Sequence, residues 1–311
     1  MIGRAVLRAK ALPVLVLLAL CPAAHADDAG LDKQVQDLLA GPGDTVQVGI
    51  WFGAPSGEPI YQRAADSALP AASVVKTAIL IELFAAHAGH LDDPLGAAAD
   101  TILADDKHPA MAPFSAAQRD EVRAGLHGTT VRTVGAIMMG SQRASNTVYN
   151  AAANLAIASL GGPPEATKKI HARDATFAGV AVRRYMLASR TATGDNAAIP
   201  ASLAAVLASI ATAKVPGDVD TATVEAMAQA MMQAKDSALG VHRHKEGNLD
   251  NDPMVCLKTG FYMRGKGKPP LVYVVGAALS AKPAGKRDDA HRRLDKMTDA
   301  VLALLRAAAR R

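Results

Sequence analysis

The chain has 311 residues, of which 50% are hydrophobic, 20% are charged and only 4% are aromatic. This length is sufficient for one large domain, or for two closely packed ones, with a sizeable core. The formal net charge of +5 includes Arg4, Arg8 and Lys10 near the N-terminus. The +2 that remains without them is too weak to indicate a nucleic-acid partner.

Residues 1–26 have the pattern of a secretory signal peptide. The three basic residues precede an apolar run, ALPVLVLLAL at 11–20, and the small-residue segment AHA follows at 24–26. The run is too short to span a bilayer comfortably. We therefore expect cleavage before Asp27, and a secreted or periplasmic protein with no integral membrane segment after the signal is removed.

The two cysteines indicate neither a disulfide nor a Cys-based zinc site. Cys21 falls in the signal segment, where it raises the alternative of lipidation, but Leu20 is bulky where a small residue is expected before a lipidated cysteine. Cys256 is then left without a partner. The segment HRHKE at 242–246 could hold a metal, but its composition favours a solvated loop. We expect no metal and no other cofactor.

The remaining pattern predicts strands near both ends of the chain and a long helical region between them. In chain order the expected elements are a helix at 31–40, strands within 44–53 and 55–63, a helix at 73–88, a mostly helical region from 89 to 212, a helix at 221–236, strands at 254–260 and 271–280, and a helix at 287–310.

Strands from both ends of the chain can pair in one antiparallel sheet. The expected fold class is α/β in the broad sense (α+β), with an antiparallel sheet flanked by the terminal helices and a second, all-helical lobe. We expect the sheet lobe to comprise about 27–72 and 213–311, and the helical lobe about 73–212. A cleft between the lobes is the natural place for a functional site.

Ser73 and Lys76 stand three residues apart at the start of the predicted helix 73–88. This spacing places both side chains on one face of a helix. A lysine in a dry cleft can lose its proton and act as a base, which a serine hydroxyl needs before it can attack a carbonyl. The alternative is an ordinary helix start with a solvated lysine.

A second motif, Lys258-Thr259-Gly260, lies on a predicted strand near the C-terminus. A strand beside the Ser73 helix could present Lys258 and Thr259 to an anionic group, and Gly260 would let substrate backbone approach closely. Each motif is weak alone. Together, and in this order, they are two of the three motifs typical of penicillin-recognising serine enzymes.

From about Tyr61 to Ser280 the chain resembles the class A serine β-lactamase family and its serine-hydrolase relatives. The resemblance is carried by four segments: YQRAADSALPAASVVK at 61–76, NTVYNAAANLAIASLGGPPEAT at 146–167, GDNAAIP at 194–200 and CLKTGF at 256–261. It implies a β-lactamase-like or transpeptidase-like fold.

The resemblance also implies roles for individual residues. Ser73 would be the nucleophile and Lys76 its proton partner. The backbone N–H groups of Ser73 and Phe261 would form the oxyanion hole, and Lys258 and Thr259 would bind the substrate carboxylate. Arg264, in the basic loop after this strand, is a further candidate for carboxylate binding.

Two departures from the family pattern concern catalysis directly. The Ser-Asp-Asn motif is best matched by Ala144-Ser145-Asn146, and a second register falls on Val148-Tyr149-Asn150. Both registers lack the serine that shuttles a proton, although Ser141 or Ser145 could swing in. Asn146 is the preferred substrate contact, with Asn150 as the alternative, and a purely structural asparagine is the non-functional interpretation.

The other departure is in the loop that carries the family's deacylating glutamate. The matching positions are Arg183 and Arg184, and the remaining nearby acids, Asp174 and Asp195, do not fit the pattern. A guanidinium stays protonated and cannot act as a base, but it could pair with an aspartate and hold the loop.

The sequence thus predicts an exported serine hydrolase that forms an ester on Ser73, with β-lactams as the leading substrate class and with slow deacylation. The alternatives are a D,D-peptidase or esterase acting on peptidoglycan-like substrates, and a non-catalytic ligand-binding protein on the same fold. We expect a monomer that takes a small-molecule substrate.

The signal segment generates the first testable prediction. Exported protein should begin near Asp27, because the basic, apolar and small-residue segments agree on that cleavage site. N-terminal sequencing or intact mass of the exported protein measures this. An intact Met1, or a lipid on Cys21, would contradict it.

Overall fold

The protein is described from a computed structural model, which covers residues 26–40, 46–56, 58–236, 238–250, 253–280 and 287–310. The expected signal segment, including Cys21, lies outside these residues apart from its last position. Across the covered ranges, no helix has the length and apolar character needed to cross a membrane.

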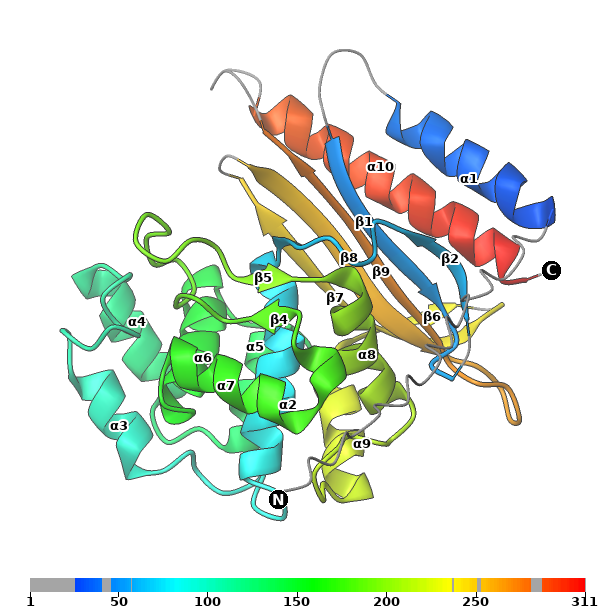
Figure 1. The fold of residues 1–311 in the computed structure, drawn as a ribbon. Coiled ribbons are helices and arrows are strands. Elements are labelled where there is room, and N and C mark those ends of the chain that lie inside the picture. The colour runs from blue at the N-terminus through cyan, green and yellow to red at the C-terminus, as the bar shows by residue number, and fades with distance from the viewer. Residues whose placement is uncertain are drawn as a thin grey trace, which may run out of the picture.

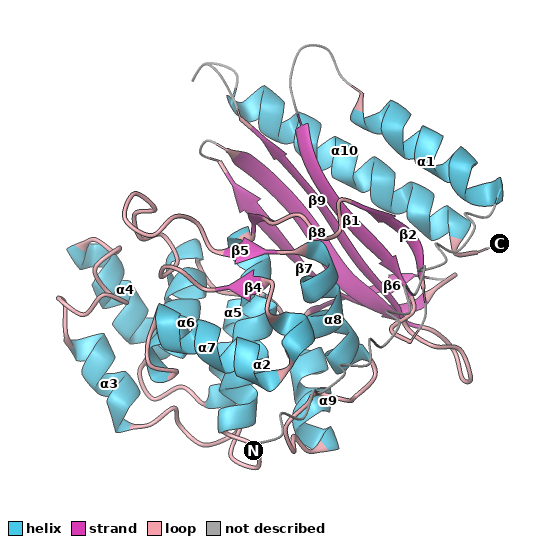
Figure 2. Cartoon of the chain, viewed as in Figure 1, coloured by secondary structure: helices cyan, strands magenta, loops and turns pink. Residues whose placement is uncertain are grey.

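A six-stranded antiparallel sheet forms one half of the molecule (Figure 2). Its spatial order is β2-β1-β9-β8-β7-β6. The strands are β1 (Val46–Gly53), β2 (Pro59–Arg63), β6 (Met232–Asp236), β7 (Gly240–Leu249), β8 (Met254–Met263) and β9 (Leu271–Leu279). β1 pairs with β9 along its whole length, so the two ends of the chain meet in the sheet as the sequence predicted.

Helices α1 (Ala26–Leu39) and α10 (Arg287–Ala308) lie together over one face of this sheet (Figure 1). The buried residues of α10 include Leu294, Val301 and Leu305, whose spacings of seven and four form one apolar stripe. The structure therefore confirms the expected antiparallel sheet flanked by the terminal helices.

The opposite face of the sheet meets a helical half built around α2 (Lys76–Ala86), which is buried from Lys76 to Phe84. A short 3-10 helix, η1 (Ala72–Val75), leads into α2. The other elements here are α3 (Ala97–Ala104), α4 (Ala116–Leu126), α5 (Val131–Met139), α6 (Asn146–Ser159), α7 (Pro163–Arg173), η2 (Ala175–Phe177), α8 (Pro200–Ala211), α9 (Thr221–Ala230) and a small sheet of β3 (Leu69–Pro70), β5 (Ala197–Ala198) and β4 (Val180–Ala181).

Two glycines allow this half to approach the sheet closely. Gly49 of β1 and Gly276 of β9 are opposite each other in the sheet. A Cβ at Gly49 would lie 2.6 Å from Pro200 Cγ, and one at Gly276 would lie 2.7 Å from Leu69 Cδ1. Contacts this short show that α8 and β3 lie almost directly on the sheet backbone.

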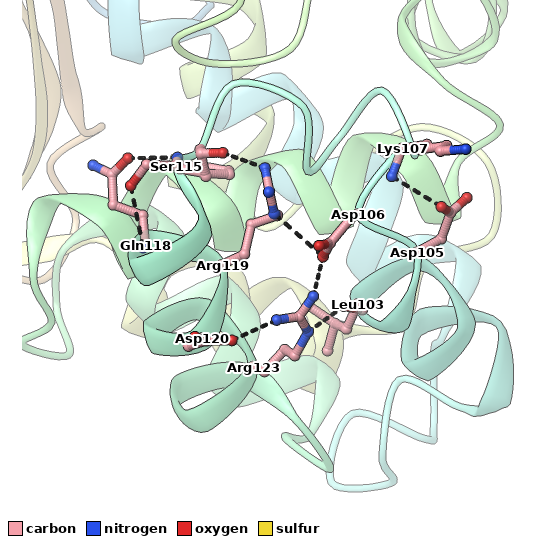
Figure 3. Close-up of polar contacts among 10 residues, drawn as sticks. Leu103, Asp105, Asp106, Lys107, Ser115, Gln118, Arg119, Asp120 and Arg123 are labelled. Carbon is pink, nitrogen blue, oxygen red and sulfur yellow. Dashed lines mark hydrogen bonds and ion pairs between the residues drawn. The ribbon is translucent and has the colours of Figure 1, made fainter.

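The polar loop after α3 serves as a structural junction (Figure 3). Asp106 pairs with both Arg119 and Arg123 of α4, and Arg123 Nε also donates to the carbonyl of Leu103 at 3.0 Å. These contacts fasten α4 to the end of α3. Both aspartates of this loop thus have partners within the helical half: Asp106 pairs with the arginines of α4, and Asp105 accepts from Lys107 N–H.

Two sequence expectations were wrong near residue 240. The helix predicted for 221–236 ends at Ala230 and is followed by β6, and the segment expected as a solvated loop at 242–246 lies within β7. The physical reason is that β7 buries basic side chains instead of exposing them to solvent. His242 stacks on Tyr262 with ring centroids 4.5 Å apart, and Lys245 is buried. A strand that buries basic side chains does not show the apolar alternation that predicts a strand.

Candidate functional site

Ser73 lies at the start of the buried helix, where η1 meets the sheet. Ala72, just before it, has a φ of +45°, a left-handed conformation that costs a non-glycine residue about 1–3 kcal/mol. Ala71 N–H donates to the carbonyl of Asn196 at 2.6 Å, which ties this turn to β5 and the loop before it. The fold therefore holds a strained turn immediately before the serine.

Lys76, one turn after Ser73, is completely buried. Its Nζ donates to Asn150 Oδ1 at 3.1 Å and lies 3.4 Å from the centre of the Tyr149 ring. Burial lowers the pKa of Lys76 well below its usual range, and the positive charge of Lys245 lowers it further. A lysine in this setting can be neutral and can accept a proton.

Lys245 of β7 is the second buried lysine of the site, and sequence reasoning missed it. Its Nζ donates to Tyr149 Oη at 2.5 Å and lies 4.8 Å from the centre of the same ring. Tyr149 thus contacts both lysines. The only signal in the sequence was the tripeptide Lys245-Glu246-Gly247, which has the Lys-x-Gly form of the expected motif with a glutamate at the middle position.

Gly247 brings β7 against the backbone of the serine. A Cβ at this position would lie 2.8 Å from Ser73 N and 3.0 Å from Val74 N. Any side chain here would push the strand away from η1. From Lys245 to Leu249, β7 pairs with β8 alone among the described strands, so its other edge faces η1 without a ladder partner.

The structure does not bring Lys258 to this cluster. β8 has its neighbours β7 and β9 on both sides, and Lys258 points to the face covered by α10. There its Nζ lies 2.9 Å from Asp295 Oδ1 and 2.5 Å from Asp299 Oδ1. Burial alone would lower the pKa of Lys258, but the hydrogen bonds that Lys258 donates to Asp299 and Asp295 outweigh burial and raise the pKa.

The neighbours of Lys258 are also separated from Ser73. Thr259 donates its hydroxyl to the carbonyl of Lys245 at 2.8 Å, so it supports the lysine and is itself fully buried. Gly260 faces Tyr273, and Phe261 is in the core. Because the Phe261 backbone is in a strand paired on both sides, its N–H is not placed to serve an oxyanion beside Ser73. Arg264 lies past the end of β8 and donates to Pro269 O at 2.7 Å.

The asparagine that contacts Lys76 is Asn150. From the sequence, Asn146 was the preferred substrate contact and Asn150 the alternative. Asn150 is buried, and its Nδ2 donates at 3.0 Å to both the backbone carbonyl and Oδ1 of Asn146. Asn146 is exposed and lines the same cavity. Ser145 caps α6 by accepting from Val148 N–H at 3.2 Å. The register Val148-Tyr149-Asn150 therefore fits the site better than Ala144-Ser145-Asn146.

A cavity of about 530 Å³ opens over Ser73. Its walls come from η1, the start of α6, the end of β7 and the loop after β4; the lining includes Ser73, Asn146, Tyr149, Asn150, Arg184, Met186, Leu187, Ser189, Arg190, Asp195, Asn196, Asn248 and Asp250. Asp174 is not among these residues. It caps η2 through Thr176 N–H at 2.8 Å.

The loop over the cavity is held by two buried asparagines. Asn196 Oδ1 accepts from the backbone N–H groups of Arg183 and Arg184 at 2.8 and 3.0 Å. Asn154 of α6 accepts from Met186 N–H at 2.6 Å and donates to its carbonyl at 3.2 Å. Leu187 then has a φ of +63° and an exposed side chain at the cavity wall.

The acid of this loop, Asp195, is neutralised by arginine. Its Oδ1 lies 2.7 Å from Arg184 Nη2 and its Oδ2 lies 2.9 Å from Arg190 Nη1. Burial raises the pKa of Asp195, but the hydrogen bonds from both arginines more than offset this, so the pKa is lowered overall. Among the described residues, the other carboxylate that lines the cavity is Asp250, which is exposed and pairs with His291.

Comparison with known proteins points to one family. A sequence model described as the beta-lactamase enzyme family matches residues 30–266. Solved structures similar to this chain include a β-lactamase from Sphaerobacter thermophilus DSM 20745 (19% identity, TM-score 0.60, covering 89% of this chain and 97% of that one) and a class A β-lactamase representative from Bacteroides cellulosilyticus DSM 14838 (14%, 0.63, 91% and 100%). A third is a point mutant of PBP-A in an acyl-enzyme complex with penicillin G (16%, 0.59, 90% and 96%). No curated protein matches the chain.

These identities show that the fold is shared and carry nothing further about activity. The sequence match over more than half of the chain is the stronger finding, because it extends from α1 to the hairpin after β8. It includes every element that contributes to the cavity.

Lys76 provides a pH-dependent prediction. Below its lowered pKa the buried ammonium is present in the fold, so Lys76→Met should raise the free energy of unfolding there. As pH rises above that pKa, the native state has lost the proton while the unfolded chain keeps it up to about pH 10.4. Wild-type stability should therefore increase with pH relative to Lys76→Met.

Urea unfolding of both proteins at about pH 6 and pH 9 measures this difference. Lys168→Met, which changes an exposed lysine of α7, is the matched control and should show little pH dependence. A wild-type-to-variant difference that is the same at both pH values would show that the native state keeps the Lys76 proton as readily as the unfolded chain does.

Proposed function

Because the chain belongs to the beta-lactamase enzyme family, we propose that it is an exported serine hydrolase that forms an acyl ester on Ser73. β-Lactams are the leading substrate class. The observation that carries this proposal is the buried group of Lys76, Asn150 and Lys245 around a serine held by a strained turn. Neither lysine has a carboxylate partner among the residues that the structure describes; burying them this way is costly, and the cost is understandable in a site that uses them.

The geometry suggests how Ser73 is activated. Neutral Lys76 accepts the proton of Ser73 Oγ, and Oγ attacks the substrate carbonyl carbon. The backbone N–H groups of Ser73 and of Asn248, on the open edge of β7, are the proposed donors to the developing oxyanion. In this proposal β7 replaces β8, and Asn248 replaces Phe261 of the sequence analysis.

Lys245 is the proposed partner of the substrate's anionic group, in place of Lys258. It is buried on β7, three residues before Asn248 of the cavity wall, and its only polar partner among the described side chains is Tyr149. Asn150 and Asn146 are the proposed contacts for a substrate amide, since both line the cavity and Asn150 also bonds to Lys76.

Hydrolysis of the ester requires a water that is held and deprotonated over its open face. The loop over the cavity offers Arg184, Met186 and Leu187, and its Asp195 is already paired with two arginines. We propose that deacylation is slow, because no unpaired carboxylate of the described loop reaches the cavity.

Two alternatives to a β-lactamase exist on the same fold. A D,D-peptidase or esterase that acts on peptidoglycan-like acyl substrates would also form a serine ester, and a point mutant of PBP-A, a structural relative, is described as an acyl-enzyme complex with penicillin G. A protein that binds a ligand on this fold without forming an ester is the remaining alternative, and mass spectrometry of the Ser73 adduct separates it from the other two.

The decisive measurement is the time course of ester formation. Mass spectrometry of the mature protein mixed with a panel of β-lactams should show one added acyl group on Ser73, and a quench experiment with a chromogenic cephalosporin should show a stoichiometric burst followed by slow turnover. Loss of a general base costs about 10²–10⁴-fold, which is sufficient to make deacylation limiting. Ser73→Ala should abolish the adduct.

Each other outcome has a distinct meaning. No adduct with any β-lactam or acyl probe would refute the serine-hydrolase proposal. Fast linear turnover without accumulated ester would refute slow deacylation and would indicate that another group, such as Asp250, activates the water.

The two lysines give a matched pair of variants. Lys245→Met should slow acylation by carboxylate-bearing β-lactams by about 10-fold or more, because the loss of a charged hydrogen bond weakens binding by about 1.5–3 kcal/mol. Lys258→Met removes a lysine of the same size from the adjacent strand and should leave the acylation rate within a few-fold, since its partners are on α10. A larger effect at Lys258 than at Lys245 would restore the original assignment.

A further inference from the structure

The family's proton-shuttling serine has no counterpart at the start of α6 in this structure. Val148, at the serine position of the better register, is buried in the core. Ser145 caps α6, and Ser141 Oγ donates to Ala136 O at 3.3 Å. Neither serine is among the residues that line the cavity. The hydroxyl that does reach the cavity from α6 belongs to Tyr149.

Tyr149 is held between the two buried lysines. Lys76 Nζ lies over the ring face, 3.4 Å from its centre, and Lys245 Nζ donates to Oη at 2.5 Å. The Lys76 amino group against the ring face and the Lys245 ammonium at the phenol oxygen together hold the ring in place. The position of Oη is therefore restricted, and a group that transfers a proton needs such a fixed position.

The direction of the hydrogen bond between Lys245 and Tyr149 determines where the phenol hydrogen can go. Lys245 has only donors, so Oη accepts this bond and the phenol's own hydrogen points elsewhere. Among the contacts of the described residues, that hydrogen has no acceptor. Tyr149 lines the same cavity as Ser73, so the unused O–H is available to a substrate there.

We propose that Tyr149 Oη is the proton donor to the leaving-group nitrogen when Ser73 is acylated, in the place of the missing serine hydroxyl. This inference rests on the proposed function of the site. It assigns a catalytic role to a residue whose side chain sequence reasoning had treated only as part of a motif register.

The proposed acylation conserves protons and electrons. The Ser73 Oγ proton passes to neutral Lys76, Oγ bonds to the carbonyl carbon, and the carbon–nitrogen bond of the amide breaks. The nitrogen keeps the bonding pair and takes the Oη proton. The Lys245 ammonium returns a proton to the phenolate, and transfer of one proton from Lys76 to Lys245, directly or through water, restores the resting state.

A competing interpretation is that Tyr149 only shields and orients Lys76. Tyr149→Phe separates the two, because it keeps the ring beneath Lys76 and removes only Oη. A leaving group that needs no proton separates them further. Penicillin leaves as an amine nitrogen, which requires protonation, whereas a p-nitrophenyl ester leaves as a stable phenolate.

The experiment compares single-turnover acylation of wild type and Tyr149→Phe with benzylpenicillin, by mass spectrometry, and with a p-nitrophenyl ester, by the nitrophenolate burst. Tyr149→Phe should lower the penicillin rate by about 10²–10⁴-fold and the ester rate by no more than a few-fold. Tyr61→Phe is the control. It removes a hydroxyl bonded to Asp32 at 2.8 Å in the sheet half and should change neither rate.

The remaining outcomes overturn the proposal in different ways. Unchanged rates with both probes would show that Oη donates no proton. An equal loss with both probes would assign Tyr149 to positioning Lys76, not to the leaving group. No Ser73 adduct with either probe in the wild type would refute the proposed function, and this inference with it.

Discussion

The site depends on the close approach of β7 to the turn that carries Ser73. Gly247 makes this approach possible, because a side chain there would overlap the backbone nitrogens of Ser73 and Val74. With the strand in that position, Lys245 enters the interior two residues earlier and meets Tyr149 of α6. Tyr149 in turn covers Lys76. One backbone contact therefore brings the sheet, α2 and α6 together around one tyrosine ring.

The loop between β4 and β5 is bonded to the turn that precedes Ser73. Asn196 holds Arg183 and Arg184 through its side chain and Ala71 through its carbonyl, so the loop and the turn before Ser73 share one anchor. Asn154 fixes Met186, and Leu187 adopts a left-handed backbone that costs about 1–3 kcal/mol. Hydrogen bonds with Asn154 and Asn196 thus position Met186 and Leu187, the apolar part of the cavity wall.

The parts of the fold and site that could be predicted from the sequence are those set by local pattern. The alternating strand near residue 50, the terminal helix with its apolar stripe, and the Ser73–Lys76 spacing at a helix start are all readable within a few residues. The sequence left open whether an arginine of this loop pairs with Asp174 or Asp195, and in the structure Arg184 pairs with Asp195.

Other features depended on which strand lies beside η1, and no local pattern states this. Lys258-Thr259-Gly260 matched the expected tripeptide, but β8 is an interior strand whose lysine faces α10. The strand at the site carries Lys245-Glu246-Gly247 in a basic segment typical of a loop. The register on α6 was ambiguous for the same reason, because only the contact with Lys76 distinguishes Asn150 from Asn146.

The electrostatics of the cavity follow from these placements. Lys76 and Lys245 bring two buried amines to one ring, and burial together with the charge of Lys245 lowers the pKa of Lys76. The carboxylate on the loop is already occupied by Arg184 and Arg190, so it does not offset the charge of Lys245. A buried cation without a carboxylate partner is costly, and an anionic group on a ligand would remove that cost by pairing with it. An anion paired with Lys245 would also offset the positive potential that Lys245 exerts on Lys76 and on Tyr149 Oη. Ligand binding and the protonation state of these groups are therefore coupled in this site.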